Sequence, residues 1–276
     1  MILLEKSDYY KVREPLKSVK SNHLFARTIV EQHLDGKIYV DNVETPGTFY
    51  IIHPYGMSLL FGKSDNEGFN SNFLDFAFNT NKIRNRAEWM QAYPNDWNTK
   101  LSDLFGNKMI KSTDNSNMEV DCKVELHTRV NFRFDLKKYQ DFKQNIDKGN
   151  FNIVRTGKEI FKDMQGSVVP MYFWKDEEDF SSRGMGFSLF HEHKLASTAY
   201  SAFIHDNLLE IGIETVEQFR NKGFAQYSCS ALIDYCLENN LEPIWSCRLE
   251  NTGSYKLAQK IGFEPTIYLP FYKLMN

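Results

Sequence analysis

The chain has 276 residues, 42% of them hydrophobic and 25% charged, which is the composition of a folded globular protein rather than a disordered or fibrous one. With 33 Lys and Arg residues against 36 Asp and Glu residues, it lacks the basic excess expected of a nucleic-acid-binding protein. It has no signal-peptide pattern and no apolar run near the roughly 20 residues that span a bilayer, so we expect a cytoplasmic protein without membrane contact. None of its four cysteines lies in a C-x-x-C pair, which argues against a disulfide framework or a zinc site. The length predicts two domains of ordinary size or one large domain.

In the first half, short apolar runs and turn residues predict a mixture of strands and helices. The expected elements are strands at 47–52 and 57–62 joined as a hairpin, helices at 70–78 and 95–104, a polar turn at 114–117, a strand at 120–134, and a polar helix that ends at 148–150. We place the boundary between the two domains at the end of that helix, so the domains are 1–148 and 149–276.

The second half begins with alternating apolar and polar residues, which predict an antiparallel meander, and then changes to a helical period. The expected elements are strands at 187–190, 195–204 and 208–216, a helix at 225–238, a strand at 243–247, a helix from 251 to 262, and two short strands at 267–269 and 271–274. This order predicts an α/β or α+β fold with a mixed sheet.

The junction between the strand at 208–216 and the helix at 225–238 has the pattern of an anion site. It reads Arg220-Asn221-Lys222-Gly223-Phe224-Ala225. Backbone N–H groups point outward at such a junction, and the positive end of the helix dipole lies behind them. Gly223 lets the main chain approach a diphosphate closely, and the two basic side chains add positive charge. By itself the pattern also fits an ordinary strand–helix turn that contains a glycine.

Two motifs together resemble the GNAT (GCN5-related) N-acetyltransferases. The first is Ile211-Gly212-Ile213-Glu214-Thr215 followed by the R-x-x-G-x-A stretch at 220–225. The second, about 25 residues further on, runs from Asn251 to Phe263 and ends in Lys-x-Gly-Phe. The resemblance covers about 187–272 and implies the GNAT fold, a mixed twisted sheet flanked by helices, with acetyl-CoA as co-substrate. Many relatives have Gly where this chain has Asn221, and we expect Asn to keep the loop because it tolerates unusual φ values.

A narrower, two-domain group of GNAT proteins is more similar still, and it includes self-resistance enzymes that acetylate antibiotics such as zwittermicin. The residues that carry this similarity are Phe173-Trp174, Glu178-Asp179-Phe180, Gly184-x-Gly186-Phe187, Ala196-Ser197, the stretch 210–215 and Trp245-x-Cys247. The resemblance implies a degenerate GNAT-like N-terminal domain at 1–148 and an acetyl-CoA-binding domain at 149–276. Residues 1–150 contain no second phosphate motif, so one acetyl-CoA site is implied.

The resemblance also assigns site residues. Those implied to bind the cofactor are Ile213, Thr215, Glu217, Arg220, Asn221, Lys222, Gly223, Phe224, Ala225, Asn251 and Ser254. The backbone of Thr215 and Glu217 is expected to pair with the pantetheine arm. No metal ligand is implied.

Glu210 and Glu214 are the candidate catalytic bases, because they share one face of the strand that should flank the thioester. We expect them to lie about 7 Å apart and to reach one acceptor site, directly or through water. The alternative is that either is a surface carboxylate or a partner of Arg220. Relatives carry a Tyr acid where this chain has Ala258, so the acid is either missing or supplied by Tyr255, Tyr268 or Tyr272.

The function that this resemblance implies is acetyl-CoA-dependent N-acetylation of a primary amine on a small molecule or peptide, with an antibiotic made by the same cell as the favoured acceptor. One alternative is a protein or peptide N-terminal acetyltransferase. Another is a non-catalytic GNAT-fold module that binds acyl-CoA or the antibiotic. The expected partner is the amine substrate rather than nucleic acid or membrane, and the oligomeric state, monomer or dimer, stays open.

Overall fold

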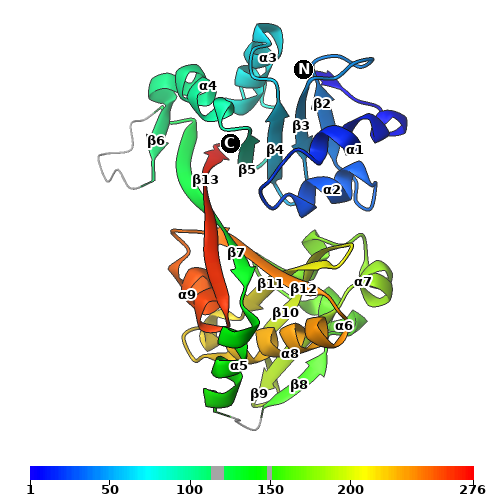
Figure 1. The fold of residues 1–276 in the computed structure, drawn as a ribbon, viewed down its shortest axis with the longest axis vertical. Helices are drawn as coiled ribbons and strands as arrows, with labels where there is room; N and C mark the ends of the chain where they lie inside the picture. The colour runs from blue at the N-terminus through cyan, green and yellow to red at the C-terminus, as the bar shows by residue number, and fades with distance from the viewer. Residues whose placement is uncertain (113–120, 148–150) are drawn as a thin grey trace. The chain divides into compact units, whose positions relative to one another are not determined.

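The structure is a computed structural model that describes residues 1–112, 121–147 and 151–276. The chain forms two compact units, drawn in Figure 1. Unit 1 consists of Met1–Arg129, Arg248–Glu250 and Tyr268–Asn276, and unit 2 of Val130–Cys247 and Asn251–Ile267. The division falls at 129/130 rather than at the expected 148/149, because Val130, Phe132 and Tyr139 pack in the hydrophobic core of unit 2.

Unit 1 contains a sheet with helices around an aromatic core. Its elements are β1 (Ile2–Leu3), η1 (Lys6–Asp8), α1 (Tyr10–Leu16), α2 (Leu24–Val30), β2 (Lys37–Val40), β3 (Thr48–Ile52), β4 (Met57–Gly62), α3 (Glu67–Ala77), β5 (Glu88–Tyr93), α4 (Asp96–Phe105), η2 (Gly106–Lys108), β6 (Met109–Lys111) and parts of β7 (Val124–Phe134) and β13 (Phe263–Leu274). The strand order is β1-β2-β3-β4-β5-β13-β7, with β6 beside β7. The predicted hairpin is confirmed, since β3 and β4 pair antiparallel.

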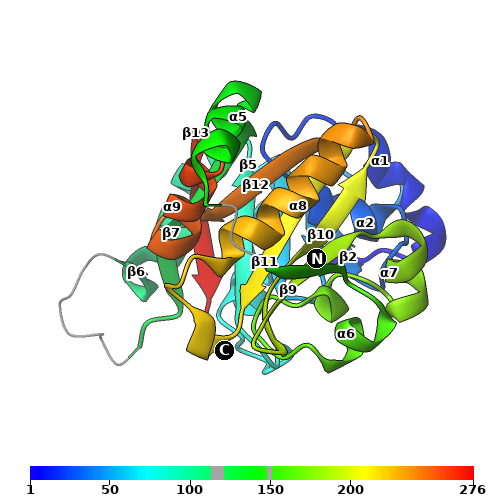
Figure 2. The same ribbon diagram turned by 90° about the horizontal axis from the view of Figure 1, so that it is seen from below.

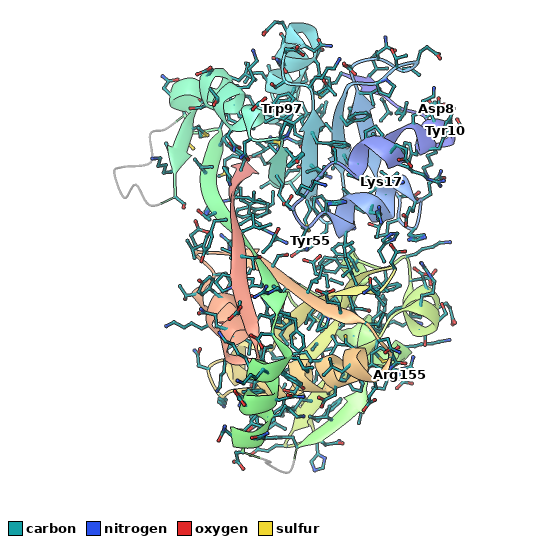
Figure 3. The ribbon with its side chains drawn as sticks, in the orientation of Figure 1. Asp8, Tyr10, Lys17, Tyr55, Trp97 and Arg155 are labelled. Carbon is teal, nitrogen blue, oxygen red and sulfur yellow. The ribbon has the colours of Figure 1, made fainter. Side chains whose placement is uncertain are left out.

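The large aromatic fraction of the sequence is accounted for in part by the core of unit 1. Seven fully or almost fully buried rings meet there, namely Tyr50, Phe69, Phe73, Phe76, Trp97, Phe105 and Tyr272. Trp97, labelled in Figure 3, also donates its indole N–H to the carbonyl oxygen of Gly62 at 3.1 Å. The hydrogen bond therefore ties helix α4 to the end of strand β4 while the ring fills the core.

The turn between β3 and β4 contains a buried histidine that makes stability depend on pH. His53 is fully buried, its Nδ1 accepts a hydrogen bond from the backbone N–H of Tyr55 at 3.1 Å, and burial lowers its pKa to about 3. The folded-state pKa lies below the unfolded value of about 6.5, so the contribution to stability is complete above pH 6.5 and is lost as the pH falls.

Unfolding in urea should show that the protein is about 2–3 kcal/mol less stable at pH 4.5 than at pH 6.5 because of His53 alone. That difference should disappear in His53→Asn and persist in the exposed-site control His33→Asn. An unchanged pH dependence in His53→Asn would contradict the assignment.

Unit 2 has its own sheet, and the predicted meander within it is confirmed. Its elements are α5 (Leu136–Asn145), β8 (Asn152–Arg155), α6 (Lys158–Asp163), η3 (Pro170–Tyr172), α7 (Glu177–Arg183), β9 (Gly186–His191), β10 (Lys194–His205), β11 (Leu208–Thr215), η4 (Glu217–Phe219), α8 (Phe224–Glu238), β12 (Glu242–Arg248), α9 (Thr252–Lys260) and the remaining parts of β7 and β13. Strands β9, β10 and β11 pair antiparallel, and β12 lies parallel to β11. The strand order is β13-β7-β12-β11-β10-β9-β8. Helix α8 crosses this sheet against β9, β10 and β11, as Figure 2 shows.

The C-terminal part of the sheet differs from the prediction. The two short strands expected at 267–269 and 271–274 are wrong, because β13 is one continuous strand from Phe263 to Leu274. Pro270 lies inside this strand. The pairing of β13 with β5 begins only at Tyr272 opposite Met90, so the missing N–H of Pro270 removes no hydrogen bond from that pairing. The turn expected at 114–117 lies outside the described residues, and the polar helix expected to end at 148–150 ends earlier, at Asn145. No helix in the described part of the chain is long and apolar enough to cross a bilayer.

Gly262 was expected to cap the end of helix α9, but the helix ends at Lys260 with Ile261 as its C-cap residue. The conformation of Gly262, one residue further on, explains why a glycine is needed there. Its φ is +94°, and a Cβ there would lie 2.8 Å from the backbone nitrogen of Tyr139. Gly262→Ala should therefore lower the free energy of unfolding by about 2 kcal/mol, measured in urea without ligand. Gly253→Ala in the same helix is the control, because its added Cβ meets no atom closer than 3.8 Å. The control should stay within about 0.5 kcal/mol of wild type, and a Gly262 variant that did the same would count against this account.

Candidate active site

The loop before α8 leaves the start of that helix open. Asn221 and Gly223 both have left-handed backbone conformations, with φ values of 62° and 78°, so Asn221 does adopt the unusual conformation expected of it. Gly223 is the N-cap residue of α8 and gives the helix no side-chain hydrogen bond. The first backbone N–H groups of α8 are therefore not capped by that residue, and the positive end of the helix dipole lies at the same place.

Strands β11 and β12 separate beside this loop. They pair only from Leu208 opposite Glu242 to Glu210 opposite Ile244. Beyond Glu210, β11 continues to Thr215 through pairs with β10 on its other side. Among the described residues, the edge of β11 that faces β12 thus carries backbone groups that the sheet does not use after the fork at Glu210. These groups are available to an extended, amide-containing ligand.

A cavity of about 490 Å³ joins the open edge of β11 to the uncapped start of α8 and to the start of α9. The predicted cofactor residues that line it are Ile213, Thr215, Arg220, Asn221, Gly223, Phe224, Ala225, Asn251 and Ser254. Two predicted residues do not line it. Glu217 starts η4, and the ammonium group of Lys222 lies over the ring of Phe219, 5.4 Å from its centroid.

Several lining residues were not predicted. They are Ser167, Val168, Phe219, Gln226, Gly253, Leu257 and Lys260. The last three lie inside the second motif at 251–263, so that motif contained a signal for them. The segment 166–168 matches no motif, and only the folded chain brings it to the cavity.

Glu214 holds that segment in place. The backbone N–H groups of Ser167 and Val168 each donate to Glu214 Oε2 at 2.9 Å, and Arg220 donates to Oε1 at 3.3 Å. A Cβ on Gly166 would lie 2.6 Å from the same carboxylate, so only glycine allows this close approach. The alternatives to a catalytic role for Glu214 are a surface carboxylate and a partner of Arg220. The structure supports the second, because Glu214 accepts a hydrogen bond from Arg220. Its hydrogen bonds position a cavity wall.

Glu210 stands at the fork between β11 and β12. Its side chain is 5% exposed, and the hydroxyl of Ser246 on β12 donates to its Oε1 at 2.5 Å. Glu210 and Glu214 share a strand face, but four residues at about 3.3 Å each separate them by about 13 Å. The expected separation of 7 Å is therefore wrong, and with it the idea that both carboxylates reach one acceptor site.

None of the candidate acids lines the cavity. Ala258 is fully buried in the core of unit 2, and Tyr255 packs its ring edge-on against Phe132. Tyr268 and Tyr272 belong to unit 1, and burial raises the pKa of Tyr272 to about 12. Within the described part of the chain, the cavity contains no tyrosine that replaces the one missing at Ala258.

The comparisons with known proteins agree with this geometry. The sequence matches the family model of GNAT acetyltransferase over residues 14–272. It is 26% identical over 250 residues to the uncharacterized N-acetyltransferase YdfB of Bacillus subtilis, covering 88% of this chain and 89% of that protein. The fold is similar to that of a GCN5-related N-acetyltransferase-like protein from Streptococcus suis, with a TM-score of 0.70 and 20% identity over 96% of this chain and 99% of the other. It is also similar to a tandem GNAT protein from the clavulanic acid biosynthesis pathway, with a TM-score of 0.63 and 9% identity over 99% and 97% of the two chains. The family match covers most of the sequence, and the chain therefore belongs to the GNAT acetyltransferase family and is an acetyltransferase.

Proposed function

We propose that the chain is a cytoplasmic, acetyl-CoA-dependent N-acetyltransferase that acetylates a primary amine. The observation that carries this proposal is the cavity that joins the uncapped start of α8 to the open edge of β11. A diphosphate would accept hydrogen bonds from the backbone N–H groups after Gly223, close to the half-exposed guanidinium of Arg220. The pantetheine arm, which carries two amides, would run along the unpaired edge at Ile213 and Thr215.

The fork at Glu210 is the proposed place of the reaction. A pantetheine arm that follows β11 from Thr215 toward the fork delivers its thioester beside this carboxylate. Glu210 takes a proton from the acceptor ammonium group, directly or through water, and the neutral amine attacks the thioester carbonyl carbon. The carbon–sulfur bond then breaks, the CoA thiolate leaves, and the second proton of the amine nitrogen passes to the thiolate or to water, which gives the neutral amide and CoA thiol. The hydrogen bond from Ser246 keeps the carboxylate oriented during these steps.

The structure of unit 1 supports the proposal that the chain has one cofactor site, in unit 2. The described residues of unit 1 have neither a fork between the parallel strands β4 and β5 nor an uncapped helix start after the first of them. Its parallel strands β4 and β5 stay paired up to Phe61 opposite Tyr93, so no fork opens between them. Helix α3, which follows β4, is capped by Asn66, whose side chain accepts from the backbone N–H of Phe69 at 3.0 Å. The acidic residues Asp65 and Glu67 flank that cap and would repel a phosphate. These features fit a degenerate GNAT-like domain without acetyl-CoA.

For the acceptor, we propose an amine of a small molecule or peptide, and in particular an antibiotic made by the same cell. The support is the sequence similarity to the two-domain self-resistance group. A non-catalytic module that binds acyl-CoA is the second candidate, because Ala258 stands where an acid is expected and no tyrosine among the described residues lines the cavity.

The proposal is tested in two steps. Millimolar acetyl-CoA should first raise the melting temperature, since a ligand at 100 times its Kd stabilises the native state by about 2.7 kcal/mol. A panel of polyamine-like and peptide antibiotics, with peptides bearing free N-termini as a separate arm, is then incubated with acetyl-CoA. A mass increase by one acetyl group, with matching release of free thiol, is the expected result. The absence of any thermal shift would refute cofactor use. A shift without acetylation or thiol release in any arm would favour the non-catalytic module.

A further inference from the structure

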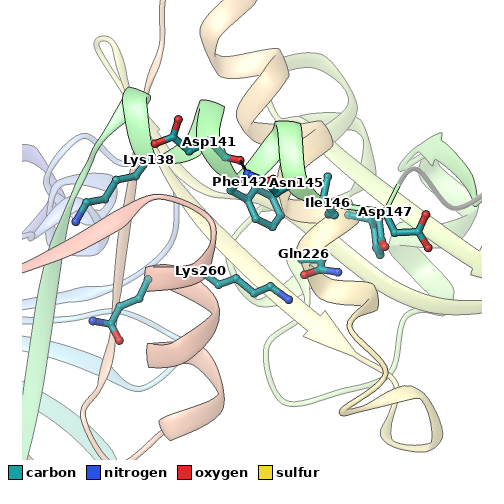
Figure 4. Close-up of a pocket in the computed structure, with 10 residues that line it drawn as sticks. Lys138, Asp141, Phe142, Asn145, Ile146, Asp147, Gln226 and Lys260 are labelled. Carbon is teal, nitrogen blue, oxygen red and sulfur yellow. Dashed lines mark hydrogen bonds between the residues drawn. The ribbon is translucent and has the colours of Figure 1, made fainter.

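Each unit contains a cavity besides the one proposed for the cofactor. In unit 2, a cavity of about 560 Å³ lies between helix α5 and the adjoining turns of α8 and α9 (Figure 4). Gln226 and Lys260 line both it and the proposed cofactor cavity, so these two meet at shared side chains. In unit 1, a cavity of about 270 Å³ is lined only by residues between Asp35 and Glu88. Its size suits a small metabolite rather than a drug-sized ligand, and the proposed reaction uses none of its residues.

The cavity of unit 1 lies on one face of the sheet, at the end where β4 and β5 begin. Lys37, Ile52 and Ser58 lie opposite one another on β2, β3 and β4. Ser58 lies opposite Met90, and Glu88 stands two residues before Met90 on β5. Because residues two apart on a strand share a face, the side chains of Lys37 and Glu88 point to the same side of the sheet. The proposed cofactor cavity of unit 2 lies instead where β11 ends, so the two sites differ in position.

Glu88 gives this cavity a buried carboxylate without an ionic partner. It is 5% exposed, and the hydroxyl of Tyr50 donates to its Oε2 at 2.6 Å. In the described part of the chain it forms no ion pair, since Arg84 and Lys37 act on it only through space. Burial raises the pKa of this carboxyl, because the charged form loses its hydration. A buried charge normally has an ionic partner, and an ammonium group bound in the cavity would supply one.

The cations that line the cavity are placed to meet an anion rather than to neutralise Glu88. The N–H groups of Arg84 donate to five backbone carbonyl oxygens, at the end of α3, at Arg86 and in the last residues of the chain. Lys37 and Arg86 are exposed and form no ion pair among the described residues. Asp35, the other acidic residue of the lining, is paired with Lys6. The cavity thus has a negative charge in its interior and two available positive charges on its solvent side.

We infer that unit 1 binds a free amino acid with an apolar side chain, with its ammonium group against Glu88 and its carboxylate toward Lys37 and Arg86. The apolar part of the wall accounts for the side chain. The rings of Tyr39 and Phe76 lie there with their centroids 6.0 Å apart, and Ile52 lies beside them. This site goes beyond the proposed function and does not depend on it, because it gives unit 1 a ligand of its own.

Calorimetry on the full chain tests the inference with two matched sets of probes. L-Phenylalanine is compared with phenethylamine, which lacks the carboxylate, and with 3-phenylpropanoate, which lacks the amino group. L-Leucine, 3-methylbutylamine and 4-methylpentanoate form the second set. In at least one set the acid should bind at least about tenfold more weakly than the amino acid, because it leaves Glu88 unpaired. The amine should bind about threefold more weakly, because contacts with exposed cations contribute less.

Two results with wild type would overturn the inference. One is that neither amino acid binds, and the other is that each amino acid binds no more tightly than its matched acid. These comparisons use the unchanged protein, so they do not depend on the folding of a variant.

Variants then locate the ligand. Glu88→Gln keeps an acceptor for the Tyr50 hydroxyl and removes the charge, so it should weaken L-phenylalanine binding at least about tenfold without weakening 3-phenylpropanoate binding. Lys37→Met should weaken L-phenylalanine binding about threefold, whereas Lys20→Met, an exposed change outside the cavity, should leave it unchanged. A folded Glu88→Gln variant with wild-type affinity for L-phenylalanine would overturn the inference. The thermal shift with acetyl-CoA should be the same in Glu88→Gln as in wild type, because the proposed cofactor site lies in unit 2.

Discussion

Glu210→Gln should lower turnover by about 10² to 10⁴ near pH 7 while leaving acetyl-CoA affinity almost unchanged. The amine arrives mostly as ammonium, and the amide of Gln cannot accept its proton. The substitution keeps the shape of the side chain and its place opposite the Ser246 hydroxyl. Initial rates with an acceptor from the amine panel, measured across pH, give the result. A Gln variant with the turnover and pH profile of wild type would remove Glu210 from the mechanism.

Glu214→Gln is the matched comparison, because it makes the same change on the same face of the same strand. Its carboxylate receives two backbone N–H groups and Arg220, so the variant should lose about 2 kcal/mol of unfolding free energy. Cofactor affinity should fall as the wall at 166–168 loosens, whereas the pH profile of turnover should keep its wild-type form. A pH profile altered in Glu214→Gln alone would exchange the roles of the two residues.

Gly223→Asp should abolish the thermal shift produced by millimolar acetyl-CoA. The change places a carboxylate at the start of α8, where the proposed diphosphate lies, and repulsion in a partly buried site then opposes binding. At a cofactor concentration of 100 times the wild-type Kd, the lost stabilisation is about 2.7 kcal/mol.

Gly223→Asn separates charge from backbone strain in this experiment. Asn has nearly the shape of Asp and tolerates the left-handed conformation at φ 78°, as Asn221 already does two residues earlier. The Asn variant should keep part of the thermal shift. Equal loss in both variants would assign the effect to the backbone, and a full shift in the Asp variant would place the diphosphate elsewhere.

The elements of unit 2 were predictable because their patterns are strong. β11 alternates regularly, and α8 carries an apolar stripe along one side, so both were expected within a residue or two of their observed bounds. The helices of the first 46 residues gave no comparable signal. α1 contains Pro15, which usually argues against a helix, and five of the seven residues of α2 are buried, so α2 has no polar face to mark its period.

In the candidate site, too, only the residues that a local sequence pattern marks could be predicted. The loop at 220–225, the proposed phosphate site, is one continuous stretch of sequence, and its residues could be named because such a site depends on local backbone conformation. The wall at 166–168 could not, because it reaches the cavity through hydrogen bonds to Glu214, which lies more than 40 residues later in the chain. The same contact favours a structural role for Glu214, which its position on the strand face alone left open.

The passage of β13 from one unit to the other has a consequence for synthesis on the ribosome. Residues 263–267 of this strand belong to unit 2, while Tyr268–Asn276 belong to unit 1, where Tyr272 pairs with Met90 of β5. When residues 1–129 have emerged, the sheet of unit 1 still lacks a strand that is translated almost 140 residues later. Unit 1 therefore cannot complete its fold co-translationally before unit 2 is made, and chaperone demand should be greatest for chains stalled between these points.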